Sequence, residues 1–143
     1  MREIDKYSFR CGVIDCFNEM VAAGVKRMAF SHTSPTAEER DVFLEPARAA
    51  CEKYGTRLYP ESDLLVTDLY PVSMCRGKHI IIFYGAEGDL KEYQDLKALK
   101  KALVESKAYH GDARYQLAYR MGKLLSYTDD AIARMIAANP EKE

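Results

Sequence analysis

One uninterrupted apolar run, Ile80-Ile81-Ile82-Phe83-Tyr84, constrains the fold more than any other feature of this chain. Successive residues of a strand point to opposite faces of the sheet, so a strand that is apolar throughout must be covered on both faces. No apolar run in the chain approaches the roughly 18 to 20 residues that a membrane-spanning helix needs. We therefore expect residues 79–84 to form the central strand of a sheet with helices on either side.

Two stretches in the first half of the chain have the spacing of amphipathic helices. Apolar residues recur at helical intervals over residues 11–24, and Gly24 is a natural end to the pattern. The stretch Thr36-Ala37-Glu38-Glu39 is a capping box, in which side chains satisfy the first free N–H groups of a helix. An apolar stripe over residues 43–54 follows, and Pro46 inside it is expected to kink the helix or divide it.

The remaining elements are predicted from the same periodicities and from turn residues. Strands are expected at residues 25–31, 56–59, 64–67 and 79–84. Helices are expected at residues 71–75, 90–106, 112–125 and 128–138, with Thr128 capping the last of them. The last third of the chain is therefore predicted to be entirely helical.

Strands that alternate with helices indicate an α/β fold with a mostly parallel sheet. We expect a small three-layer sandwich of about four mostly parallel strands, with helices on both faces and a run of helices at the C-terminal end. A chain of 143 residues is most simply one domain, spanning residues 1–143. A domain of this size buries roughly 70% of its unfolded-chain surface, which is enough for a core without disulfides.

Composition and charge narrow the class of partner. The formal net charge is −1, so nucleic acid and anionic membranes are not expected partners. The N-terminal residues are charged from the second position and lack the apolar segment of a secretory signal. We therefore expect the protein in the cytoplasm, where thiols stay reduced.

The four cysteines do not indicate a metal site. Cys11 and Cys16 are separated by about 140° on a helix, so they do not share a face. Cys51 and Cys75 are isolated, and the chain has no C-x-x-C motif and no histidine pair at ligand spacing. Neither a metal nor a cofactor is predicted.

Polar residues at strand ends give the strongest indication of a binding site. In an open α/β sheet with parallel strands, ligands bind beyond the carboxyl ends of the strands. The residues in that position are Ser31, His32, Thr33, Ser34, Asp68 and Tyr84. We expect these side chains to bind a small polar or anionic ligand. The plain structural alternative is that His32 ends a strand and Asp68 begins a turn.

Two other functions remain open at this stage. Tyrosines gather in the last third of the chain, at positions 109, 115, 119 and 127, and tyrosine is favoured at interfaces. The C-terminal helices could therefore form a protein-interaction surface or a homodimer. The third hypothesis is a small hydrolase or transferase, with His32 as the base, Asp68 as its orienting carboxylate and Ser31 or Ser34 as the nucleophile. Whether the protein is an enzyme stays undecided by the sequence.

Overall fold

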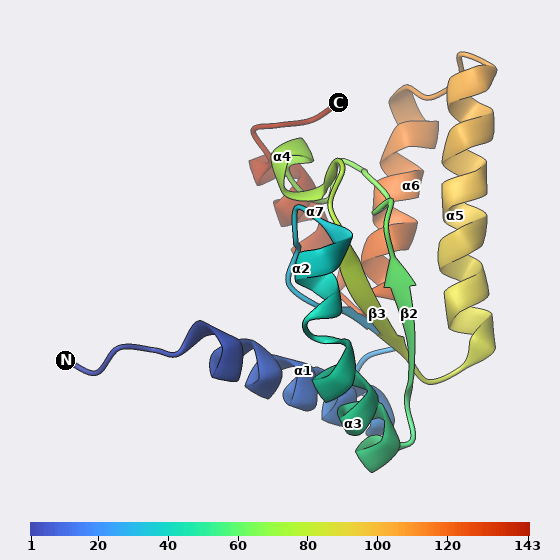
Figure 1. Ribbon diagram of the computed structural model, residues 1–143. Helices are drawn as coiled ribbons and strands as arrows, with labels where there is room; N and C mark the ends of the chain where they lie inside the picture. Colours follow the sequence, from blue (N-terminus) through green and yellow to red (C-terminus); the bar gives the residue numbers. More distant parts are fainter.

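A three-stranded antiparallel sheet lies at the centre of the protein, as the computed structural model of residues 1–143 shows (Figure 1). The strand order is β1-β3-β2, with β1 at Met28–Phe30, β2 at Arg57–Glu61 and β3 at Ile80–Tyr84. Met28 pairs with Tyr84 and Phe30 with Ile82 on one side of β3, while β2 pairs along the other side. All five residues of β3 are buried, so the prediction of a central strand covered on both faces is confirmed.

The predicted fold class is wrong in the number and direction of its strands. The sheet has three strands and not about four, and both strand pairs are antiparallel, so this is not a three-layer sandwich around a mostly parallel sheet. The predicted strand at residues 64–67 does not form. Strands β1 and β2, which are joined through two helices as the sequence predicts, are not neighbours, because β3 lies between them and pairs antiparallel with both.

Helices α1 (Lys6–Ala22) and α3 (Leu44–Tyr54) cover one face of the sheet, with the short helix α2 (Ala37–Asp41) leading into α3 (Figure 1). The core on this side is a cluster of nine buried residues. It joins Ile81 and Phe83 of β3 to Ile14 of α1 and Ala47 of α3. Buried apolar area of this kind is the main stabilising term that holds the helices on the sheet.

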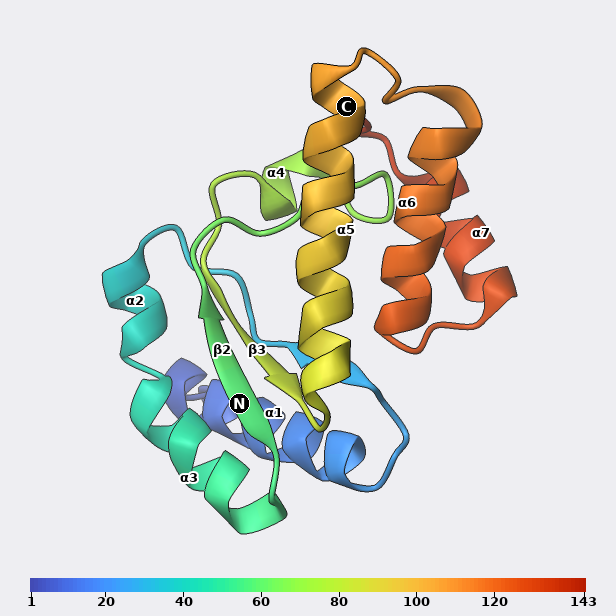
Figure 2. The ribbon, with the colours of Figure 1, turned by 90° about the vertical axis from the view of Figure 1, so that its right-hand side faces the viewer.

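Helix α5 (Glu87–Glu105) covers the opposite face, and α6 (Gly111–Leu124) and α7 (Asp129–Ala138) pack beyond it (Figure 2). The larger core, of 19 buried residues, lies on this side. Ile80 and Ile82 of β3 point into it, as do Tyr93 and Leu96 of α5, all of them fully buried. No helix of the protein is both long enough and apolar enough to cross a membrane.

The N-terminal ends of α2 and α7 are capped by the side chains that the sequence predicts. The Thr36 side chain accepts a hydrogen bond from the Glu39 N–H, and the Thr128 side chain accepts one from the Ala131 N–H. Gly55 ends α3 with φ at 72°, a left-handed conformation that glycine adopts without steric cost. The helix that contains Pro46 is divided, but the break falls before the proline, between α2 and α3.

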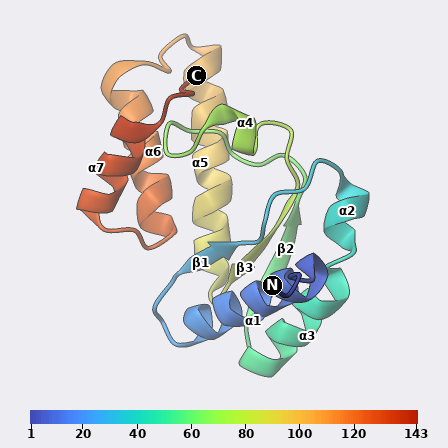
Figure 3. The ribbon, with the colours of Figure 1, turned by 90° about the vertical axis from the view of Figure 1, so that its left-hand side faces the viewer.

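A long connection, residues 62–79, joins β2 to β3 and contains the single-turn helix α4 (Val72–Cys75). Its apolar residues enter the larger core from outside the sheet; they are Leu64, Leu65, Val66, Leu69 and Cys75. Figure 3 shows β1 at one edge of the sheet, with α4 above it. The connection therefore forms a wall opposite the end of β1.

The last residues of the chain bind to this connection. Glu141 accepts hydrogen bonds from the backbone N–H groups of Val72 and Ser73, at its carbonyl and at Oε2 respectively, and so satisfies the free N-terminal donors of α4. Glu143 contacts three cations from three parts of the fold: Arg76, Lys100 and Arg114. Asn139 is buried and donates to the Asp68 carbonyl at 3.0 Å.

Candidate functional site

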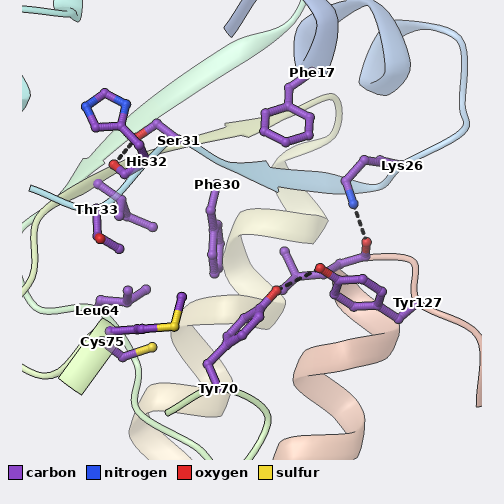
Figure 4. Close-up of a pocket in the computed structure, with 13 residues that line it drawn as sticks. Phe17, Lys26, Phe30, Ser31, His32, Thr33, Leu64, Tyr70, Cys75 and Tyr127 are labelled. Carbon is purple, nitrogen blue, oxygen red and sulfur yellow. Dashed lines mark hydrogen bonds between the residues drawn. The ribbon is translucent and has the colours of Figure 1, made fainter. Parts of the chain in front are cut away.

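A pocket of about 430 Å³ opens between the end of β1 and the wall that contains α4 (Figure 4). Six segments of the chain contribute to it: α1, the α1–β1 loop, the end of β1, the connection 62–79, the start of β3 and the loop between α6 and α7. Nine of the 13 lining residues are hydrophobic. The lining consists of Phe17, Lys26, Phe30, Ser31, His32, Thr33, Leu64, Tyr70, Met74, Cys75, Ile80, Leu125 and Tyr127.

The end of β1 supplies three of the residues that the sequence singled out, Ser31, His32 and Thr33. Ser31 is fixed by the sheet: its Oγ accepts a hydrogen bond from the Ile81 N–H at 2.8 Å and donates one to the His32 carbonyl at 3.1 Å. The hydroxyl thus uses both its proton and an acceptor position within the chain, so Ser31 contributes to the shape of the pocket wall. Thr33, the residue after His32, is exposed and lies at the mouth of the pocket.

His32 lies at the edge of the pocket, with its ring packed edge-to-face on Phe43 at 4.5 Å between centroids. Its Nε2 atom is buried and has no hydrogen-bond partner. Burial lowers the pKa of the imidazole, and the nearby charge of Arg10 lowers it further. His32 is therefore neutral at pH 7 and carries an unsatisfied nitrogen at the border of the site.

Lys26 is the one cation with a fixed charge in the pocket lining, which contains no aspartate or glutamate. Its ammonium donates to the Leu125 carbonyl at 2.7 Å and lies 5.3 Å from the centroid of the Tyr127 ring. Burial alone lowers the pKa of this ammonium, with no contribution from a neighbouring carboxylate. The charge of Lys26 is thus half-buried without a counterion.

Two tyrosine hydroxyls meet beside Lys26 (Figure 4). The Tyr70 and Tyr127 oxygens are 2.9 Å apart and share one hydrogen bond. Burial and this contact raise the pKa of Tyr70, so its phenol stays protonated. A pair of phenols has two protons and the shared bond uses one, so the other remains available to a ligand.

Cys75 forms part of the opposite wall, and its side chain is poorly suited to nucleophilic chemistry. Its residue is only 3% exposed, and burial raises the pKa of the thiol to about 11. The reactive form of cysteine is the thiolate, which is scarce at neutral pH when the pKa is this high. Cys75 therefore contributes a small apolar surface to the pocket.

The other residues selected from the sequence lie outside the pocket. Ser34 forms a two-way backbone bridge with His79, at 2.9 Å in each direction. Both oxygens of Asp68 bind Arg114, at 2.8 and 2.9 Å, and none of its side-chain hydrogen bonds goes to His32. Tyr84 pairs with Met28, at the opposite end of β1 from Ser31. The expectation that these side chains converge rested on parallel strands, and the antiparallel sheet removes that basis.

The clustered tyrosines of the C-terminal helices have different surroundings. Tyr115 is 40% exposed, whereas Tyr119 donates to Asp129 at 3.0 Å within the chain. Tyr109 is packed against the larger core, and Tyr127 lines the pocket. They therefore do not form one continuous exposed surface.

All four cysteines are free, and no three His, Cys, Asp or Glu side chains are grouped closely enough to hold a metal ion. Among the pocket residues that the sequence did not single out for a site are Lys26 and Tyr70, which come from distant segments, whereas Tyr127 was singled out only as part of a possible interaction surface. The only local signal among them is the position of Lys26 at the start of the predicted strand 25–31. Comparison of this chain with protein-family models, with curated proteins and with solved structures finds no match.

Proposed function

We propose that this protein is a small-molecule-binding domain and that the pocket beside β1 is its binding site. The observation that carries the proposal is the lining itself: nine apolar residues of 13, interrupted by a few fixed polar groups. Ligand pockets typically have this composition and a volume of about 300–1,000 Å³, a range that includes the 430 Å³ found here. Apolar walls supply affinity, and the polar groups fix the orientation of the ligand.

Binding without covalent catalysis is favoured by the state of the potential nucleophiles. Ser31 Oγ is engaged in the sheet, and the Cys75 thiol is protonated at neutral pH. Asp68 is occupied by Arg114, so it does not orient the His32 imidazole in the way that a catalytic base requires. A cytoplasmic location is part of the proposal, because four free cysteines are compatible with a reducing compartment.

A thermal-shift screen of the purified protein tests the proposal, with a panel of amino acids, dicarboxylates, sugar phosphates, nucleotides and aromatic acids. A ligand present at 100 times its dissociation constant stabilises the native state by about 2.7 kcal/mol. For a domain of this size each kcal/mol raises the unfolding midpoint by roughly 2–6 °C, so a specific ligand gives a measurable shift.

Two substitutions at Thr33 then locate the binding site. Thr33→Trp places a large side chain in the mouth and is expected to abolish the shift, whereas Thr33→Val keeps the shape of threonine and is expected to preserve it. Thr33 is exposed, so both variants should fold. A hit that survives Thr33→Trp unchanged would place the ligand elsewhere and contradict the proposal.

A further inference from the structure

The pocket combines one unpaired charge with apolar walls that include four phenylalanine and tyrosine rings, and this combination restricts the class of ligand. We infer that the ligand is a small aromatic acid whose carboxylate binds Lys26 and whose ring system lies among Phe17, Phe30 and Tyr70. The inference rests on the proposed function, because it names the class of molecule that the same pocket binds.

Lys26 has no counterion within the chain. The next residue in the chain, Arg27, is more exposed and yet pairs with two carboxylates, Asp89 and Glu92. Lys26 has only the Leu125 carbonyl and the face of the Tyr127 ring. A partly buried charge is costly unless an opposite charge compensates it. A ligand carboxylate in the pocket would supply that charge.

The Lys26 ammonium and the hydroxyls next to it offer free hydrogen-bond donors to a ligand. One Lys26 N–H is used by Leu125, which leaves two for a ligand. The Tyr70 and Tyr127 pair keeps one free O–H, and Figure 4 shows the two hydroxyls at the same end of the pocket as Lys26. Ammonium and phenol donors together match the two oxygens of a carboxylate, and bonds to an ionised acceptor are about twice as strong as neutral ones.

The pocket lining limits the negative charge that a ligand can carry. A nucleotide or sugar phosphate carries two or more negative charges, and sites for such groups use several cations or a glycine-rich loop at a helix N-terminus. The lining contains no arginine and no glycine, and Lys26 is its one fixed cation. One monoanionic group is therefore the charge that this pocket can neutralise.

Aromatic side chains contribute to the remaining walls of the pocket. Four aromatic rings line the pocket, those of Phe17, Phe30, Tyr70 and Tyr127. Phe30 is held by an edge-to-face contact with the buried Tyr93 ring, at 5.9 Å between centroids. Aromatic pairs attract one another beyond what their buried area alone gives, so these rings favour an aromatic ligand over an aliphatic one of equal size.

Titration calorimetry with a matched pair of probes tests the inference. The probes are 2-naphthoate and its neutral isostere 2-naphthamide, which differ in charge and hardly in shape. We expect the acid to bind about tenfold more tightly than the amide, as a charge-assisted hydrogen bond would give. In Lys26→Met, the affinity for the acid should fall to the affinity for the amide. The affinity for the amide should stay the same. Arg27→Met removes a neighbouring charge outside the pocket and should preserve the difference.

Equal affinities of the two probes, or a difference that persists in Lys26→Met, would overturn the inference. If the probes then still fail to bind the Thr33→Trp variant, the pocket remains the binding site, and the proposed function stands without the inference about the acid. Failure of both probes to bind also overturns the inference, and the wider ligand panel then decides the proposed function separately. Because the amide is uncharged and binds mainly through the apolar walls, an affinity that is nearly unchanged in Lys26→Met shows that the variant pocket is intact.

Discussion

Gly122 of α6 lies so close to Ile132 of α7 that a Cβ atom at Gly122 would be 2.5 Å from the Ile132 Cγ1 atom. Ile132 is completely buried, so its side chain has little room to move away. The contact sets the separation of α6 and α7, and the loop between these helices carries two residues of the pocket, Leu125 and Tyr127.

The first prediction is that Gly122→Ala lowers the free energy of unfolding by about 1–3 kcal/mol, because overpacking outweighs the gain in helix propensity. Urea denaturation measures the change. Gly12→Ala is the matched control: Gly12 lies inside α1 with no atom within 4 Å of the added methyl group. That variant should be stabilised by about 0.5–1 kcal/mol. Equal effects at the two glycines would show that the close contact is not maintained.

The second prediction concerns the ion pair of Asp68 with Arg114, whose side chains are 10% and 24% exposed. Asp68→Asn removes the charge and keeps the shape, so Arg114 loses its bidentate partner at a cost of about 1–3 kcal/mol in unfolding free energy. Asp63→Asn is the exposed control, with a side chain 88% exposed, and should change stability by less than about 0.5 kcal/mol. Ligand affinity should be the same in Asp68→Asn as in the unsubstituted protein; a large loss of affinity would restore a role for Asp68 in the site.

The third prediction is a loss of stability in mild acid that depends on His32. Burial lowers the pKa of His32 below its ordinary value of 6.5, so the unfolded chain binds a proton at a higher pH than the native protein does. The contribution of neutral His32 to the unfolding free energy is therefore complete above the pKa of His32 in the unfolded chain. It decreases as the pH falls through that pKa and levels off below the pKa of His32 in the native protein. Urea midpoints recorded between about pH 5.5 and 7.5 measure this slope.

His32→Phe is the variant that isolates this titration, because it keeps an aromatic ring against Phe43 and removes the ionisable group. Its urea midpoint should depend less on pH than that of the unsubstituted protein. Identical pH profiles for the two proteins would mean that His32 has the same pKa in the folded and unfolded chain.

The fourth prediction orders the cysteines by reactivity. Cys16 is exposed, while Cys51 and Cys75 are buried with raised thiol pKa values. Iodoacetamide at about pH 8 should alkylate Cys16 rapidly and the two buried thiols only after unfolding, because the thiolate is the reacting species. Peptide mass spectrometry identifies the sites, and Cys16→Ser should remove the fast reaction. Rapid alkylation of Cys75 in the native protein would show that the pocket wall opens.

The features that the sequence predicts well are those with a local cause. The N-caps at Thr36 and Thr128 need only side chains within three residues, and the burial of β3 is visible in its own composition. The apolar stretch Leu64–Thr67 shows the limit of such reasoning. A short apolar run is typical both of a strand and of a connection that inserts into the core, and only tertiary packing distinguishes the two. The alternation of strands with helices, on which the prediction of a parallel sheet rested, likewise does not determine which strands are neighbours, and β3 lies between β1 and β2.

The candidate site likewise contains residues that the local sequence predicts and residues that only tertiary packing brings together. Ser31, His32 and Thr33 were selected because they follow a strand, and this local position does bring them to the pocket. The group that gives the pocket its charge, Lys26, is held by Leu125, 99 residues away in the sequence. Tyr70 and Tyr127 meet across 57 residues. Contacts of this range depend on how the helices pack, so no short motif could reveal them.

The position of β3 has a consequence for how the chain is made. Both outer strands pair only with β3, so a chain growing on the ribosome holds β1 and β2 without partners until β3 has emerged. The sheet then closes in one late step that joins residues far apart in sequence, which is slow compared with helix formation. A chain cut short before Ile80 would leave both β1 and β2 without any strand partner, and unpaired strands are surfaces that drive aggregation. The nascent chain can therefore pair its strands, and so avoid aggregation through them, only after β3 has been made.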